Sequence, residues 1–169
     1  MNRFQQTLAE HQLQLTRSQT NTLQVNVGRL CNLACKHCHV EAGPHRQEVM
    51  SRQTMDAVIR FAADHNFSVI DITGGAPELV PDIAYLLEQL APLSQKTMMR
   101  TNLVALLDEK QTDLLNLCTQ LKIALVASFP SVNQGQTDAQ RGNGVWEQSI
   151  AMLHRLNSLG YGQPGTGLE

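Results

Sequence analysis

The residues best suited to chemistry lie in one short stretch, residues 31–44, which reads CNLACKHCHVEAGP. It contains three of the four cysteines of the chain, Cys31, Cys35 and Cys38, in a CxxxCxxC spacing. Three thiolates this close together can bind a cubane iron–sulfur cluster, which has four irons and normally takes four cysteines. No fourth cysteine lies nearby, so the spacing predicts a [4Fe-4S] cluster with one iron open to a substrate or a cofactor.

Other interpretations of the same stretch stay open from the residues alone. His37 or His39 could complete a tetrahedral Cys₃His zinc site. Residues 35–39 also read CxxCH, the haem c attachment pattern, although that chemistry belongs to exported proteins. Three structural thiols are a further alternative. The remaining cysteine, Cys118, lies on an apolar helical stripe, and we interpret it as a small buried hydrophobe.

Composition narrows the class of protein and its partners. The chain has 169 residues, a length typical of about one domain, and 42% of them are hydrophobic, enough for a real core. Its 13 basic and 15 acidic residues are scattered, which argues against a nucleic acid or membrane partner. No apolar run approaches the roughly 20 residues of a membrane helix, and the N-terminus lacks a signal-peptide core. We therefore expect a cytoplasmic protein, in which clustered thiols indicate metal or redox chemistry.

Strands and helices must alternate to position these residues. Short apolar or β-branched runs predict strands at residues 22–27, 68–73, 97–101 and 123–128. Between and after them, apolar residues recur at helical spacing, with Ser51 as a cap before the first stripe and Asn66 as its stop. The stripes are Met55, Val58, Ile59 and Ala62; Ile83, Leu86, Leu87 and Leu90; Leu114, Leu117, Cys118 and Leu121; and Trp146, Ile150 and Leu153. Residues 2–14 are predicted as an additional N-terminal helix.

This order predicts an α/β fold of about four βα units with a parallel sheet, either doubly wound or an arc of a TIM-type barrel. The carboxyl ends of parallel strands share one edge, where ligands bind. The loop that carries the three cysteines, residues 28–50 and called the cysteine loop below, follows the first strand. The other unusual residues follow the next three strands. These are Gly74 and Gly75, Thr101 and Asn102, and Ser128. We expect all of them to converge on one site.

Two connections of about 20 and about 16 residues, before Ser51 and before Val145, exceed the usual limit of roughly 12 to 15 residues for an idle loop. In the first, Gly43 and Pro44 are predicted to turn the chain back toward the first helix. In the second, Arg141 of TDAQRGNG is a candidate partner for a carboxylate, because its planar fork matches that geometry. A solvated loop arginine is the alternative.

These motifs together resemble the radical S-adenosylmethionine (SAM) superfamily. The resemblance is closer to one branch, the arsenosugar-biosynthesis radical SAM proteins with a Cys-rich C-terminal region. It rests on five stretches from about Leu23 onward: LQVNVGRLCNLACKHCHVEAGP, DITGGAPEL, RTNL, ASFPSVN and QRGNGV…SIAMLHRLNSLGYG.

The resemblance implies a partial TIM-type barrel and an enzyme. Cys31, Cys35 and Cys38 would hold the [4Fe-4S] cluster, and the open iron would bind SAM and drive its reductive cleavage to a 5′-deoxyadenosyl radical. The implied reaction joins a 5′-deoxyadenosyl group to a methylated arsenical, with an electron donor such as flavodoxin or ferredoxin.

The resemblance also implies SAM contacts beside the cluster. Backbone carbonyls of Gly74 and Gly75 would meet the methionine amino group, since glycine permits close backbone approach. The ribose or the methionine carboxylate would be met by Thr101, Asn102, Ser128 and Arg141. Capping of a helix is the competing role for the Asn and Ser side chains. His39 is expected to donate a hydrogen bond to cluster sulfur. Ala76 and Pro77 separate Glu78 from the glycines, so Glu78 receives no ligand role.

We expect two parts, a leading segment at residues 1–20 and a partial radical SAM barrel at residues 21–169. The family pattern calls for further strands and a Cys-rich region, and residues 163–169 are interpreted as the approach to a fifth strand. We therefore expect an incomplete barrel that folds marginally by itself. The competing functions are a zinc- or iron–sulfur-binding module, an electron carrier without SAM chemistry, and an inactive fragment.

Overall fold

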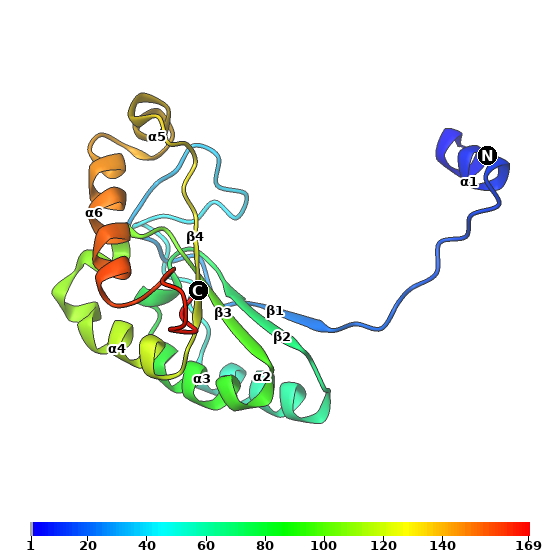
Figure 1. Ribbon diagram of the computed structural model, residues 1–169, viewed down its shortest axis with the longest axis horizontal. Coiled ribbons are helices and arrows are strands. Elements are labelled where there is room, and N and C mark those ends of the chain that lie inside the picture. Colours follow the sequence, from blue (N-terminus) through cyan, green and yellow to red (C-terminus); the bar gives the residue numbers. More distant parts are fainter. Residues whose placement is uncertain (1) are drawn as a thin grey trace.

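The computed structural model describes residues 2–169 and has the predicted alternation of strands and helices (Figure 1). In chain order the elements are α1 (Arg3–Glu10), β1 (Thr22–Asn26), α2 (Arg52–Asp64), β2 (Val69–Thr73), α3 (Ile83–Leu90), β3 (Lys96–Thr101), α4 (Thr112–Gln120), β4 (Ala124–Ala127), α5 (Gln134–Arg141) and α6 (Val145–Ser158). Four short 3₁₀ turns lie among them: η1 (Pro77–Leu79), η2 (Ala91–Leu93), η3 (Val104–Leu107) and η4 (Glu109–Gln111).

The sheet is parallel throughout, with its strands in the order β1-β2-β3-β4. It curves without closing, which confirms the prediction of an α/β fold with a partial barrel. Residues 163–169 form no strand, although the backbone N–H of Leu125 in β4 donates to the carbonyl of Glu169 at 2.8 Å. The segment after α6 therefore returns to the outer edge of β4.

The hydrophobic core lies between one face of the sheet and the helices α2, α3 and α4. Ile70 and Ile72 of β2 are fully buried there against Leu86 and Leu87 of α3 and Met55 of α2. Alternation along a strand sends every second side chain to this face, so the intervening residues point to the other one. A second apolar cluster joins α6 to η3 and α4.

Three of the four predicted helical stripes are confirmed. The first helix begins after Ser51, whose hydroxyl accepts a hydrogen bond from the N–H of Thr54 at 3.2 Å, and it ends at Asp64, just before the predicted stop. The fourth stripe is wrong by one position, because the buried residues of α6 are Val145, Ser149, Met152 and Leu156. The reason is tertiary: Met152 and Leu156 pack against η3, whereas the indole N–H of Trp146 donates to the carbonyl of Val132.

The long connection before α6 is not the loop that its length predicted. It contains α5, whose N-cap Asn133 accepts a hydrogen bond from the N–H of Gln136 at 3.0 Å. The helix reads QGQTDAQR and has no apolar stripe, so periodicity alone missed it. Arg141 is its last residue.

The N-terminal segment stands apart from the rest. Helix α1 has no buried residue, and the chain after it runs as an extended arm to β1 (Figure 1). The helix is shorter than predicted, ending at Glu10. Within residues 2–169 there is no helix of the length and apolar character that a bilayer crossing requires.

Candidate cluster and cofactor site

The cysteine loop is held in place by its own returning segment. It leaves β1 and comes back to α2, and the N–H of Arg29 donates to the carbonyl of Glu48 at 2.7 Å. The N–H of Cys31 donates to the carbonyl of Gly43 at 3.3 Å, and the N–H of Gly43 donates to the carbonyl of Arg29 at 3.1 Å. The predicted turn at Gly43 thus closes the loop on itself, which is how so long a connection stays ordered without helix or strand.

The Gly74–Gly75 turn packs directly against the start of that loop. The N–H of Gly75 donates to the carbonyl of Gly28 at 2.9 Å, and the N–H of Ala76 donates to the carbonyl of Leu30 at 2.8 Å. A Cβ on Gly75 would lie 2.4 Å from the Leu30 carbonyl oxygen, and Gly74 has φ +154°. Glycine is therefore required here for the approach of two backbone segments. The predicted contact of the two glycines with SAM stays a prediction.

The three thiols line one cavity of about 380 Å³ at the carboxyl edge of the sheet. None forms a disulfide. The N–H of Leu33 approaches the sulfur of Cys31 at 3.4 Å, and the N–H of Ala42 approaches that of Cys38 at 3.3 Å. Burial raises the pKa of Cys31 and of Cys35, and the neighbouring thiols raise both further. The three thiols therefore face one shared space.

The donor set of this cavity suits a cluster. Within residues 2–169, no three side chains among His, Cys, Asp and Glu surround a position for a single metal ion. In a cubane cluster each cysteine binds a different iron, so three thiolates spread around one cavity meet its requirement. Two of the three sulfurs also accept backbone N–H groups, as cluster ligands do. His37 and His39 line the cavity but remain exposed.

Asn102 is buried at the end of β3, where its side chain contacts the loop that carries the cysteines. Its side-chain Nδ2 lies 3.5 Å from the sulfur of Cys31 and donates to Oδ1 of Asn32 at 2.7 Å. Its Oδ1 accepts from the N–H of Ala105, a residue of η3, at 2.9 Å. Thr101 is also buried, and its hydroxyl accepts from the N–H of Leu103. Both residues line the cavity, and their contact with SAM stays a prediction.

Arg141 is buried, so the alternative of a solvated loop arginine is wrong. Only 6% of the residue is exposed; Nη2 donates to the Ser128 hydroxyl at 2.7 Å and Nη1 to the carbonyl of Asn102 at 3.3 Å. Within residues 2–169 its Nε has no hydrogen-bond partner and no carboxylate pairs with it. Burial lowers its pKa, and the thiols of Cys35 and Cys31 oppose that shift. A buried cation without a counter-charge is costly, so the cavity suits an anionic group.

Glu78 is the polar residue that sequence reasoning set aside. It lies in η1 and is 3% exposed, and neither carboxylate oxygen has a hydrogen-bond partner within residues 2–169. Burial raises the pKa of Glu78. The nearby Thr101 hydroxyl partly offsets that rise, although no hydrogen bond of normal geometry joins the two side chains. Its charge acts on Cys31, but it does not line the cavity. The sequence feature that could have identified Glu78 is its position just after the Gly74–Gly75 turn.

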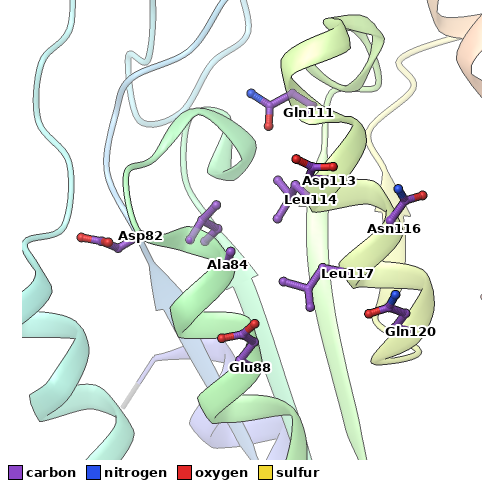
Figure 2. A pocket seen from close by; sticks show the side chains of 10 residues that line it. Asp82, Ala84, Glu88, Gln111, Asp113, Leu114, Asn116, Leu117 and Gln120 are labelled. Carbon is purple, nitrogen blue, oxygen red and sulfur yellow. The ribbon is translucent and has the colours of Figure 1, made fainter.

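A second hollow, of about 520 Å³, lies on the outer helical layer between α3 and α4 (Figure 2). The carboxylates of Asp82, Glu88 and Asp113 line it together with carboxamide side chains. None of the predicted site residues reaches it. The chemistry predicted from the sequence therefore belongs to the cavity at the thiols.

Comparison with known proteins identifies the family. Residues 25–167 match the model of the Radical SAM superfamily. The chain belongs to the radical SAM superfamily. Members of this superfamily are enzymes that use a [4Fe-4S] cluster and SAM, so the resemblance drawn from CxxxCxxC is confirmed at the level of the superfamily.

Other radical SAM proteins are similar over much of the chain. A probable GTP 3′,8-cyclase of Pyrococcus abyssi is 27% identical over 82% of this chain and 44% of its own length. The subtilosin biosynthesis protein AlbA of Bacillus subtilis is 28% identical over 77% of the chain and 29% of its own length. The structure of Streptococcus suis SuiB bound to S-adenosylmethionine has a TM-score of 0.70 at 21% identity, covering 92% of this chain and 35% of that one. The chain thus spans less than half the length of each.

Proposed function

We propose that this chain binds a [4Fe-4S] cluster through Cys31, Cys35 and Cys38, with SAM beside it. One observation carries the proposal: three thiols line one cavity at the carboxyl edge of a parallel sheet, together with a buried arginine that has no carboxylate partner within residues 2–169. When bound, the cluster and SAM supply reductive cleavage of SAM to methionine and a 5′-deoxyadenosyl radical.

The residues around the thiols hold and orient these groups. Arg141 is fixed by Ser128 and the Asn102 carbonyl, which leaves its Nε free for the carboxylate of SAM. The Gly74 and Gly75 carbonyls meet the methionine amino group. The side-chain amide of Asn102 contacts the sulfur of Cys31 and so keeps that side chain in position. Thr101, Asn102 and Ser128 stand within the same cavity for contact with the ribose or the carboxylate.

We further propose that the substrate is a methylated arsenical, which receives the 5′-deoxyadenosyl group. The support is the resemblance of the stretches CHVEAGP and GGAPEL to the arsenosugar branch. An electron donor such as flavodoxin or ferredoxin would reduce the cluster in the cytoplasm. Residues 1–20 form a leading segment, and residues 21–169 form the partial barrel of this enzyme.

Peptide modification is a second candidate. It is favoured by the similarity to AlbA, a protein of bacteriocin biosynthesis. Under this proposal the cavity and the cofactors are the same, and only the substrate differs.

Anaerobic reconstitution with iron and sulfide tests the cluster. We expect about four irons and four sulfides per chain, with a brown colour. Cys35→Ala should lose them, whereas Cys118→Ala, which also removes one thiol, should keep them because Cys118 lies in the hydrophobic core. A colourless protein that contains zinc, or equal iron in both variants, would contradict the proposal.

Turnover tests the reaction and the substrate. The reduced, reconstituted protein with SAM should release 5′-deoxyadenosine, and Arg141→Lys should weaken SAM binding because lysine lacks the planar fork. Mass spectrometry with a methylated arsenical should then show an adenosylated product. Adenosylation absent with the arsenical, but modification present with a candidate precursor peptide, would favour the second candidate.

A further inference from the structure

The face of the sheet opposite the helices carries a group of polar side chains toward the carboxyl ends of its strands. Ile70 and Ile72 of β2 face the helices, and Asp71 between them lies on the other face. Gln24 of β1 stands opposite Asp71 in the register, and Arg100 of β3 reaches it from the other side. This face therefore presents hydrogen-bonding groups beside the apolar Met98 and Val126, which pair with Asp71 and Arg100 in the register.

Three strands join in one charged network on that face. The Nε of Arg100 donates to Oδ1 of Asp71 at 3.0 Å, and Nη2 donates to Oδ2 at 2.7 Å. The side-chain amide of Gln24 donates to Oδ2 of Asp71 at 2.8 Å. Asp71 is 3% exposed, so it is a buried anchor. It holds one side of the guanidinium in a fixed orientation.

The other side of the same guanidinium is free. A guanidinium carries five N–H donors, and Asp71 occupies only the Nε side of the fork. Within residues 2–169, Nη1 of Arg100 has no hydrogen-bond partner, and 47% of the side chain is exposed. Arg100 lines the same cavity as the three thiols. The outer N–H groups on Nη1 and Nη2 thus form a pre-oriented pair that matches the two oxygens of an oxyanion.

We propose that Arg100 binds an oxyanion group of the substrate, a small molecule bearing a carboxylate, a phosphate or an oxygenated arsenic group. This deepens the proposed function and rests on it, because Arg141 then serves SAM while Arg100 serves the second molecule. Arg100 lies within β3, before Thr101 and Asn102, on the open face of the sheet. The thiols and Arg141 lie beyond the strand ends. Arg100 and Arg141 are therefore placed to bind two different ligands, one within the sheet and one beyond the ends of its strands.

The chain offers a matched control on the same strand. Lys96→Gln removes one positive charge at the other end of β3, where Lys96 pairs with Glu169 away from the cavity. Arg100→Gln removes one charge inside the cavity. Because that change leaves Asp71 buried without its cation, the double variant Asp71→Asn/Arg100→Gln provides a neutral amide pair that keeps the strands joined.

The experiment is calorimetric titration of the reconstituted, SAM-loaded protein with three probes: dimethylarsinate, inorganic phosphate and acetate. We expect at least one probe to bind, and the probe that binds best identifies the oxyanion. Arg100→Gln and the double variant should weaken that binding by about tenfold to a hundredfold, the loss typical of a charge-assisted bidentate pair. Lys96→Gln should leave it unchanged. Iron content and SAM binding should match the wild type in all variants.

Three results would overturn the inference: no probe binds, Arg100→Gln binds the probe as the wild type does, or Arg100→Gln loses SAM as well. The last would make Arg100 part of the SAM site. If the wild type takes up no cluster, the proposed function fails instead. The same titration on cluster-free protein then still decides whether Arg100 binds an oxyanion.

Discussion

At the scale of single residues, the four cysteines have different surroundings and therefore different chemistry. Cys35 and Cys38 are half-buried at the cavity, whereas Cys118 is fully buried in the core between α4 and the sheet. Burial raises the pKa of Cys118 to about 12, and the charge of Glu78 adds to the rise. The thiolate is the reactive form of cysteine, so Cys118 should be inert.

We predict that iodoacetamide at pH 8 alkylates Cys35 and Cys38 in the native, cluster-free protein and leaves Cys118 unmodified. Peptide mass spectrometry measures this, and labelling in denaturant, where all four cysteines should react, is the control. Equal labelling of Cys118 in the native protein would mean that its place in the core is wrong.

Asn102 connects the end of β3 to the cysteine loop and to η3. Asn102→Ala should lower the free energy of unfolding of the cluster-free protein by about 1 to 3 kcal/mol, because the Ala105 N–H and Asn32 lose their buried partner. Asn102→Asp keeps the oxygen that accepts from Ala105, so it should recover part of the loss. Urea unfolding measures both variants, and wild-type stability in Asn102→Ala would contradict the assignment.

At the scale of elements, the site exists because two loops touch through their backbones. The backbone N–H groups of Gly75 and Ala76 donate to the start of the cysteine loop, and the N–H of Gly43 in the returning segment donates to it as well. Below them, the network of Asp71 joins β1, β2 and β3. These contacts tie the loop that carries the thiols to the sheet.

Gly75→Ala should destabilise the protein by more than about 1 kcal/mol and reduce cluster uptake, because the new Cβ would lie 2.4 Å from the Leu30 carbonyl oxygen. Gly135→Ala is the matched control, since its Cβ meets only Asn133 Oδ1 at 3.4 Å and it lies in α5, where alanine favours the helix. Denaturant unfolding and iron content measure both. Equal stability of the two variants would show that the turn and the loop are not in close contact.

The pair of Asp71 and Arg100 should make stability depend on pH in acid. The hydrogen bonds from Arg100 hold the pKa of Asp71 below its usual value of about 3.9. The stabilisation is therefore present above that value and is lost as the pH falls through the lower pKa of the folded state. Asp71→Asn should have a free energy of unfolding about 1 to 3 kcal/mol lower than that of the wild type at pH 7, and this difference should become smaller below pH 4. A difference that does not change with pH in urea unfolding experiments would contradict this prediction.

At the scale of the whole molecule, the sheet and helices form one body, and the N-terminal arm lies outside it (Figure 1). Deleting residues 2–19 should change the free energy of unfolding by less than about 0.5 kcal/mol, because α1 has no buried residue. Denaturant unfolding of the shortened chain checks this. A larger loss would mean that the segment packs on the barrel.

Much of the fold and of the site follows from local patterns. The strands and three of the helices show their periodicity in the sequence, and the βα order requires a parallel sheet with its loops on one edge. That edge brought the cysteine loop, Gly74, Asn102 and Ser128 to a single cavity, as predicted. The three cysteines, the glycine pair and the other quoted stretches together led to the radical SAM superfamily.

Only the tertiary structure decided the features that depend on contacts between distant residues. Helix α5 lacks an apolar stripe, so nothing local revealed it or the burial of Arg141 at its end. Within residues 2–169, the carboxylate of Glu78 lacks a hydrogen-bond partner, and Arg100 pairs with Asp71. Both features likewise depend on residues far apart in the sequence. Hydrophobic periodicity in the sequence shows which face of a helix or strand is buried. The charge state, the orientation and the hydrogen-bond partners of a buried side chain are set instead by the residues that pack against it in the folded protein.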